Sequence, residues 1–246
     1  MLNKEYILEK INEYCTLNEQ LSEETFYDMV VEPLDHNNCF EGYSWTWATG
    51  VTKGVLIFDE LDYVVKIPLY CEYYEGYSDW DEETEEYVVI EEGGPTEEPF
   101  SGVQVEGYIH DNDWDYCETE SYRYLEAEKH DVSEYFAKTW YIGSVKDWPI
   151  YAQIRANMYC SLESCSVRSR KNYSNEERES VKSIKEATHF YVSDEWMIDF
   201  INYWGEDALM DLINFCDEWF IDDLHDGNLG YICGAPCLVD YSSFDA

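Results

Sequence analysis

Residues 220–244 read FIDDLHDGNLGYICGAPCLVDYSSF and place polar residues on either side of short apolar runs. The segment LGYICGAPCLV is typical of two short strands joined by a turn at CGAP. Such a hairpin would return Asp240 to the side of Asn228. One carboxylate oxygen and one amide oxygen could then share a divalent cation, because hard oxygen ligands suit Mg²⁺. Asp223, earlier in the segment, would be left to accept a proton from a hydroxyl group.

The region before this segment is rich in predicted strands. The runs YSWTWA, GVLIF and YVVKIPL follow Tyr43, and AKTWYIG and WPIYAQI lie further along the chain. Lys66 stands in the middle of the third run, where a buried ammonium group would need a partner. Alternation along the strand also allows Lys66 to point outward from an edge strand. The connection TGVTKG contains Gly50 and Gly54, which would permit a close approach of the backbone to an anion.

Residues 113–130 are predicted to form a helix with one carboxylate on its inward face. The inward stripe consists of Cys117, Glu120, Tyr124 and Ala127. Glu120 is therefore the first candidate for an ion-pair partner of Lys66. Glu118 is the second candidate, and the ordinary position of a helical glutamate is the protein surface.

The remaining apolar periodicity predicts helices at both ends of the chain. Residues 1–40 form a helical segment with Ile7 and Ile11 on one stripe. A second helix is expected to begin at Ser193, to end at Gly205 and to carry an inward stripe of Trp196, Phe200 and Tyr203. We therefore expect an α+β fold with a helical segment at 1–40, a β-rich region at 41–156 and a mostly helical region at 157–246.

The charge balance is strongly negative. The chain has 54 Asp and Glu against 15 Lys and Arg, a formal net charge of −39. Between Lys66 and Arg123 there are eighteen acidic residues and no Lys or Arg, mostly within an insert at 71–112. Such a run is usually a solvated loop, but the interleaved aromatic residues predict that part of the insert is ordered. The charge disfavours binding to nucleic acid or to anionic membranes and favours cations or basic protein surfaces as partners.

The cysteines and the hydropathy predict the compartment. Nine cysteines are scattered without a CxxC pair, as expected for reduced thiols packed as small apolar groups. No secretory leader opens the chain and no apolar run has the length of a membrane span. We expect a cytoplasmic protein.

The sequence DLHDGN at 223–228 resembles the D-L-x-x-x-N loop of protein kinases and, more closely, the D-L-H-x-G-N loop of aminoglycoside and choline phosphotransferases. The segment LVDYS, which follows this loop in the chain, resembles the D-F-G segment of kinases by its position. The resemblance implies a protein-kinase-like fold with an antiparallel-sheet N-lobe and a reduced, mostly helical C-lobe. It further implies that Asp223 is the catalytic base, that Asn228 and Asp240 hold the metal, and that His225 is structural.

The same resemblance implies a nucleotide site that uses ATP and Mg²⁺. Lys66 would bind the α- and β-phosphates, Glu120 would hold Lys66, and the loop with Gly50 and Gly54 would cover the phosphates. Asp222 stands where protein kinases have an arginine, and few residues follow Asp240. Small kinase-like proteins of bacteriophages and their bacterial hosts look similar in this respect.

Two functions follow as hypotheses. The first is an ATP- and Mg²⁺-dependent phosphotransferase with an unknown acceptor. The second is a catalytically inactive kinase-fold protein whose acidic surface binds a basic host protein. A phage-encoded inhibitor that imitates nucleic acid, acting in the host cytoplasm, is one form of the second hypothesis, since aligned carboxylates can imitate a phosphate backbone.

Overall fold

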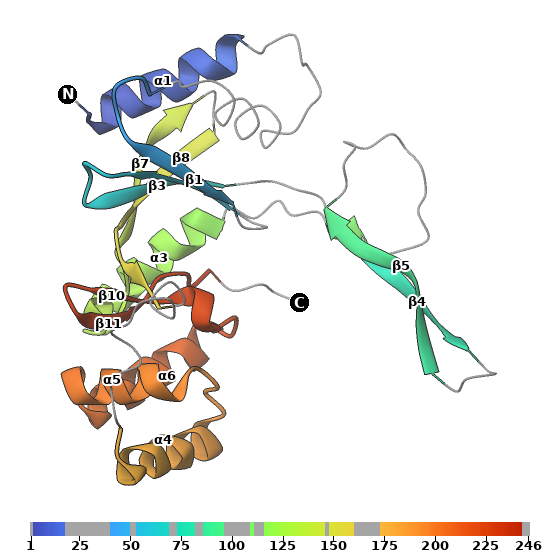
Figure 1. Cartoon of the computed structure of the whole chain (residues 1–246), viewed down its shortest axis with the longest axis vertical. Coiled ribbons are helices and arrows are strands. Elements are labelled where there is room, and N and C mark those ends of the chain that lie inside the picture. Colours follow the sequence, from blue (N-terminus) through green and yellow to red (C-terminus); the bar gives the residue numbers. More distant parts are fainter. Residues whose placement is uncertain are drawn as a thin grey trace. The chain divides into compact units, whose positions relative to one another are not determined.

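The structure is a computed structural model of the whole chain, and it has an α+β architecture (Figure 1). The described residues are 2–17, 40–49, 53–68, 73–81, 86–95, 109–110, 116–145, 148–159 and 173–242. The chain divides into two compact units. Unit one contains 1–61, 65–115 and 142–150, and unit two contains 62–64, 116–141 and 151–246. The expected division at residues 40 and 156 stays a prediction.

A five-stranded sheet confirms the β-rich region. Its order is β1-β2-β3-β8-β7, and β1 and β2 form an antiparallel pair. The strands are β1 (Trp45–Thr49), β2 (Lys53–Phe58), β3 (Tyr63–Pro68), β7 (Thr139–Val145) and β8 (Trp148–Ile154). Each of them overlaps one of the runs of β-branched and aromatic residues singled out above, because such residues suit a pleated surface buried on one face.

The helix α1 (Lys4–Leu17) in unit one buries Ile7 and Ile11, as the stripe predicts. Gly143 of β7 lies directly under this helix, since a Cβ atom there would lie 2.5 Å from a methyl carbon of Leu8. Residues 18–39 of the helical segment expected at 1–40 lie outside the described residues.

The acidic insert contains a small antiparallel sheet of its own (Figure 1). Its order is β5-β4-β6, with strands β4 (Tyr73–Asp81), β5 (Glu86–Pro95) and β6 (Ile109–His110). The run YVVI at 87–90 lies within β5, so the prediction that part of the insert is ordered is confirmed. A loop predicted from the Gly and Pro residues of EEGGPTEEP at 91–99 is wrong for residues 91–95, which belong to β5 and pair with β4. Pairing overrides the Gly and Pro signals there, because Pro95 stands at the end of an edge strand that can lack a donor.

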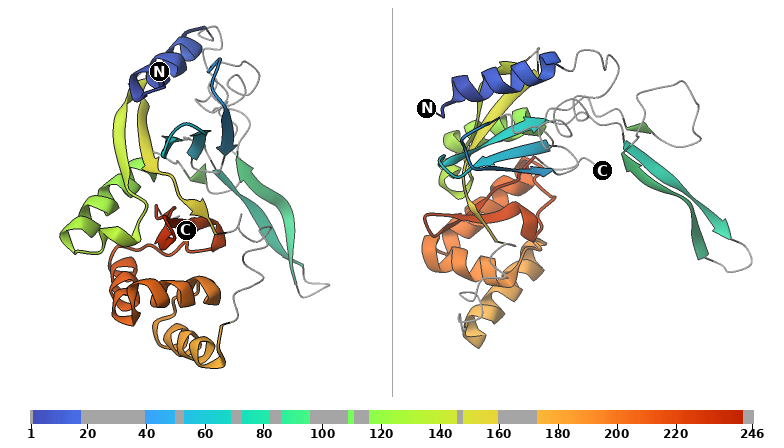
Figure 2. Two further views of the ribbon diagram at one scale, coloured as in Figure 1. Left: turned by 60° about the vertical axis from the view of Figure 1, so that its left-hand side comes forward. Right: turned by 45° about the horizontal axis from the view of Figure 1, so that its top comes forward.

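Unit two combines helices with a small sheet (Figure 2). The helices are α3 (Tyr116–Lys129), α4 (Asn175–Thr188), α5 (Asp194–Trp204) and α6 (Glu206–Glu218). The sheet has the order β11-β10-β9, with strands β9 (Asn157–Met158), β10 (Leu229–Ile232) and β11 (Ala235–Leu238). Trp196 of α5 is fully buried in the core, and its indole nitrogen donates to the Gly230 carbonyl at 3.4 Å. The core thereby supports β10, the strand that follows the loop at 223–228.

Helix α5 shows one error in the predicted inward stripe. Trp196 and Phe200 are buried as expected, but Tyr203 is 56% exposed. The inward stripe continues to Trp204, whose indole nitrogen donates to the Pro236 carbonyl at 3.1 Å. The stripe therefore follows the i, i+4, i+8 spacing. Gly205 ends the helix with φ of +100°, as predicted.

Among the described helices, none is both long enough and apolar enough to cross a membrane.

Candidate functional site

A tight hairpin forms the centre of the candidate site. Strands β10 and β11 pair in antiparallel register from Leu229 with Leu238 to Ile232 with Ala235. The two turn residues, Cys233 and Gly234, both have positive φ, at +51° and +90°. Positive φ at both positions is the mark of a type I′ turn, whose twist matches that of the flanking strands. The hairpin predicted from the sequence is confirmed.

The hairpin brings Asp240 back to Asn228. The Val239 amide donates to the Asn228 carbonyl at 2.8 Å, and the Asp240 amide lies 3.5 Å from the same oxygen. Asn228 is 6% exposed, and its side-chain nitrogen donates to the Asp223 carbonyl at 2.6 Å. Asn228 is therefore bonded to the segments that carry both aspartates. Because its amide nitrogen serves this bond, its amide oxygen is the atom suited to a cation.

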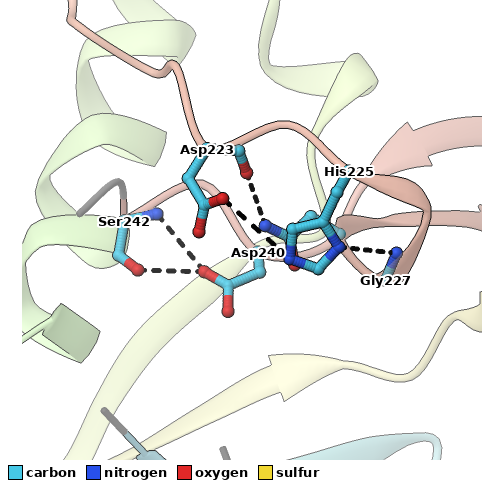
Figure 3. A network of polar contacts seen from close by, with 6 residues as sticks. Asp223, His225, Gly227, Asp240 and Ser242 are labelled. Carbon is cyan, nitrogen blue, oxygen red and sulfur yellow. Dashed lines mark hydrogen bonds and ion pairs between the residues drawn. The ribbon is translucent and has the colours of Figure 1, made fainter. Parts of the chain in front are cut away.

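His225 organises the loop between Asp223 and Asn228. The Gly227 amide donates to the His225 Nδ1 atom at 3.0 Å, so a neutral ring carries its proton on Nε2. That Nε2 atom lies 4.0 Å from a carboxylate oxygen of Asp223 (Figure 3). A Cβ atom on Gly227 would lie 2.6 Å from the imidazole ring, so a side chain at this position would displace the ring from its present place. This geometry gives His225 a structural role in the loop.

The Asp240 side chain is oriented by Ser242. The Ser242 hydroxyl donates to one carboxylate oxygen of Asp240 at 2.9 Å, and the Ser242 amide lies 3.4 Å from the same oxygen (Figure 3). Ser242 is itself buried. A short polar side chain that bonds the backbone two residues on forms a turn of the Asx type. The turn fixes the direction in which the Asp240 side chain points at the end of the hairpin.

Glu120 lies in a buried polar network next to this segment. Its side chain is fully buried, and the Thr139 hydroxyl donates to it at 3.0 Å. The Gln153 side-chain nitrogen donates to the Thr139 oxygen at 2.9 Å and to the Val239 carbonyl at 2.7 Å. Two side chains therefore connect the Glu120 carboxylate to the peptide bond before Asp240. Glu118 is exposed, which makes Glu120 the inward carboxylate of α3.

Tyr241 closes the same network. Its hydroxyl donates to the Ala137 carbonyl at 2.8 Å and lies 3.3 Å from the Thr139 oxygen. Burial, followed by the nearby negative charge of Glu120, raises the pKa of Tyr241 well above its usual value. The phenol therefore stays neutral and remains a hydrogen-bond donor across the physiological pH range.

The predicted phosphate-binding residues belong to unit one. Lys66 is 3% exposed in β3, a strand with neighbours on both sides, so the alternative of an outward-pointing lysine on an edge strand is wrong. Gly54 lies in β2 and pairs with Thr49, whereas Gly50 lies outside the described residues. Lys53, which the sequence did not single out, is also buried, at 4% exposure. The sequence signal that could have identified Lys53 is its position beside Gly54 at the start of a predicted strand.

In the described residues, the acidic side chains do not form a metal site by themselves. Within the described part of the chain, no three His, Cys, Asp or Glu side chains gather closely enough to hold an ion. A cation at Asn228 and Asp240 would therefore need further oxygen ligands from water or from a bound anion. Magnesium is often held in this way, by one or two carboxylates together with substrate phosphates.

Comparisons of the chain with models of protein families, with curated proteins and with solved structures found no match.

Proposed function

We propose that the protein is an ATP- and Mg²⁺-dependent phosphotransferase with a protein-kinase-like arrangement of its site. The observation that carries the proposal is the hairpin that bonds Val239 to Asn228 and so places Asp240 beside it. The bond from the Asn228 amide to the Asp223 carbonyl supports it further. Asp223, Asn228 and Asp240 are the residues to which the resemblance assigns the chemistry.

The proposed roles divide between a metal and an acceptor. Asn228 and Asp240 hold the Mg²⁺ of the nucleotide, and Asp223 accepts the proton of the acceptor hydroxyl. The loop of Gly50 and Gly54 covers the phosphates. The resulting catalysis is positioning and charge neutralisation, which is the main contribution of proteins to phosphoryl transfer.

Lys66 and Glu120 complete the proposed nucleotide site. The resemblance assigns the α- and β-phosphates to Lys66 and an ion pair with Lys66 to Glu120. Both side chains are buried, and the Glu120 carboxylate accepts from the Thr139 hydroxyl. Functional sites are where such groups are commonly retained.

Calorimetry with ATP tests the proposal. Wild-type protein is expected to bind ATP more tightly with Mg²⁺ than without it. Asp240→Asn is expected to weaken Mg²⁺-dependent binding by about tenfold or more, because the cation loses an anionic ligand. Asp226→Asn removes the same charge from an exposed side chain in the same loop and is the matched control. Binding that does not depend on Mg²⁺, or equal losses in both variants, would contradict the proposal.

A second candidate function rests on the acidic insert. Its strands β4, β5 and β6 form a sheet of their own, and the stretch from residue 67 to 122 carries eighteen acidic residues without a Lys or Arg. The concentration of negative charge in this stretch of sequence supports binding to a basic protein partner. In this case the nucleotide site would be dispensable for the biological effect.

Charge neutralisation in the insert separates the two functions. The experiment replaces five acidic residues together, aspartate by asparagine and glutamate by glutamine: Asp81, Glu82, Glu83, Glu85 and Glu86. Association with a basic partner is expected to become slower and weaker, and less dependent on salt, because many screened charges act together. Proteins retained from host lysate at low and high salt are compared for both forms, with ATP affinity as the control. Unchanged retention by the neutralised protein would contradict the second function.

A further inference from the structure

Arg123 of α3 joins two segments that are distant in the sequence. Its Nη1 atom donates to the Tyr241 carbonyl at 2.7 Å, and its Nη2 atom donates to the Phe220 carbonyl at 3.2 Å. Phe220 begins the segment that leads to Asp223, and Tyr241 directly follows Asp240. One guanidinium group therefore holds the backbone directly after Asp240 and the backbone three residues before Asp223.

The Phe220 carbonyl is held in place by the end of α6. Phe220 has φ of +51°, and the Ile221 amide donates to the Cys216 carbonyl at 2.8 Å. This bond and the left-handed residue form a Schellman motif, which usually has glycine at the left-handed position. The accompanying apolar contact is present as well, because Ile221 and Cys216 are both in the core. The Phe220 side chain is 74% exposed, so it is the backbone of this residue that is fixed.

The backbone around Asp240 is held on both sides. Before it, the Val239 carbonyl accepts from Gln153 at 2.7 Å, and after it, the Tyr241 carbonyl accepts from Arg123. The Tyr241 ring is buried, which limits the movement of this segment further. Asp240 is therefore placed by contacts to its neighbours in the chain as well as by Ser242.

We infer that Arg123 is a positioning residue that sets the separation between Asp223 and Asp240; its catalytic consequence rests on the function proposed above. A guanidinium group suits this role, because its planar fork offers two donors in a fixed geometry. A lysine offers a compact charge on a flexible stem and cannot hold both carbonyls in the same way. Glu120 lies one turn earlier on α3, so the helix that carries the buried carboxylate also holds both loops.

Hydrogen exchange tests the bridge without any ligand. In Arg123→Met, the amides of 221–229 and of 239–242 are expected to exchange about tenfold faster or more, because both loops lose an anchor. The core amides of α5 and α6 are expected to keep their wild-type rates. Arg178→Met is the matched control, since Arg178 is exposed on α4 and lies over the Tyr173 ring. Unchanged rates in either loop, or a uniform increase throughout unit two, would overturn the inference.

Binding of Mg²⁺–ATP by the same variants tests the consequence. Loss of an outer contact to a metal ligand commonly lowers affinity about 10–100-fold, and this range is expected for Arg123→Met. Arg123→Lys is expected to give a smaller loss of affinity for Mg²⁺–ATP. This variant is also expected to fold, so it serves as the test if Arg123→Met does not fold. Wild-type protein that fails to bind Mg²⁺–ATP would refute the proposed function, while the exchange rates would still decide the bridge. Faster exchange in both loops with unchanged affinity would overturn the positioning role.

Discussion

Asp223→Asn is expected to lower the rate of phosphotransfer about 10²–10⁴-fold, the usual contribution of a general base. The affinity for Mg²⁺–ATP is expected to stay close to that of the wild type. The reason is the division of roles, in which Asp223 acts on the acceptor and Asp240 acts on the metal. The asparagine keeps the size of the side chain and the backbone carbonyl that accepts from Asn228. Transfer of the γ-phosphate of labelled ATP and calorimetry measure the two quantities.

Two variants make this prediction specific. Asp226→Asn changes the charge of the same loop and is expected to leave phosphotransfer near the wild-type rate. Asp240→Asn is expected to lower affinity as well as rate. If Asp223→Asn weakened Mg²⁺–ATP binding as much as Asp240→Asn, the roles of the two aspartates would be wrongly assigned.

Trp196→Ala is expected to lower the free energy of unfolding by about 3–5 kcal/mol, the usual range for removing a large buried aromatic side chain. Trp196 is fully buried, and its ring centroid lies 5.2 Å from that of Phe200. Its indole nitrogen also donates to the carbonyl of Gly230 in β10. The substitution therefore leaves a cavity beneath the hairpin that carries Asp240. Denaturant unfolding followed by circular dichroism measures the change.

Tyr203→Ala provides the control on the same helix. Tyr203 is more than half exposed, so its removal is expected to change the free energy of unfolding by no more than about 0.5 kcal/mol. A similar loss in both variants would contradict the prediction, because the exposed face of α5 would then contribute as much stability as its inward face.

The sequence predicted the elements whose period is strong. The strand runs before Lys66 and the two short runs around Gly234 alternate or cluster in the way that strands require. The inward position of Glu120 followed from helical spacing alone, and its burial confirms the register. For this reason the contact between Asn228 and the Asp240 segment could be predicted, since it depends on a local hairpin.

Other features depend on information that lies outside any local window. Helix α4 was missed because its apolar content is low, although Ser174 and Glu177 form a capping box at its start. Tyr203 was placed inward because the spacings i+7 and i+8 both suit a helix face, and packing against the hairpin selects Trp204. The contacts of Arg123 and Gln153 to carbonyls near Asp240 follow from tertiary structure and have no local signal.

Hydrogen bonds around Asp240 differ widely in the length of chain that they close. The Val239–Asn228 bond closes a short hairpin, whereas Gln153 and Arg123 reach acceptors 86 and 118 residues away. Loop-closure entropy grows with chain length, and an isolated hairpin forms in about 1–10 μs. During refolding, Asp240 therefore reaches Asn228 early, while its final orientation waits for α3 and β8 to dock. The ability to bind a metal-bound ligand is expected to return in the slowest kinetic phase, after the hairpin itself has formed.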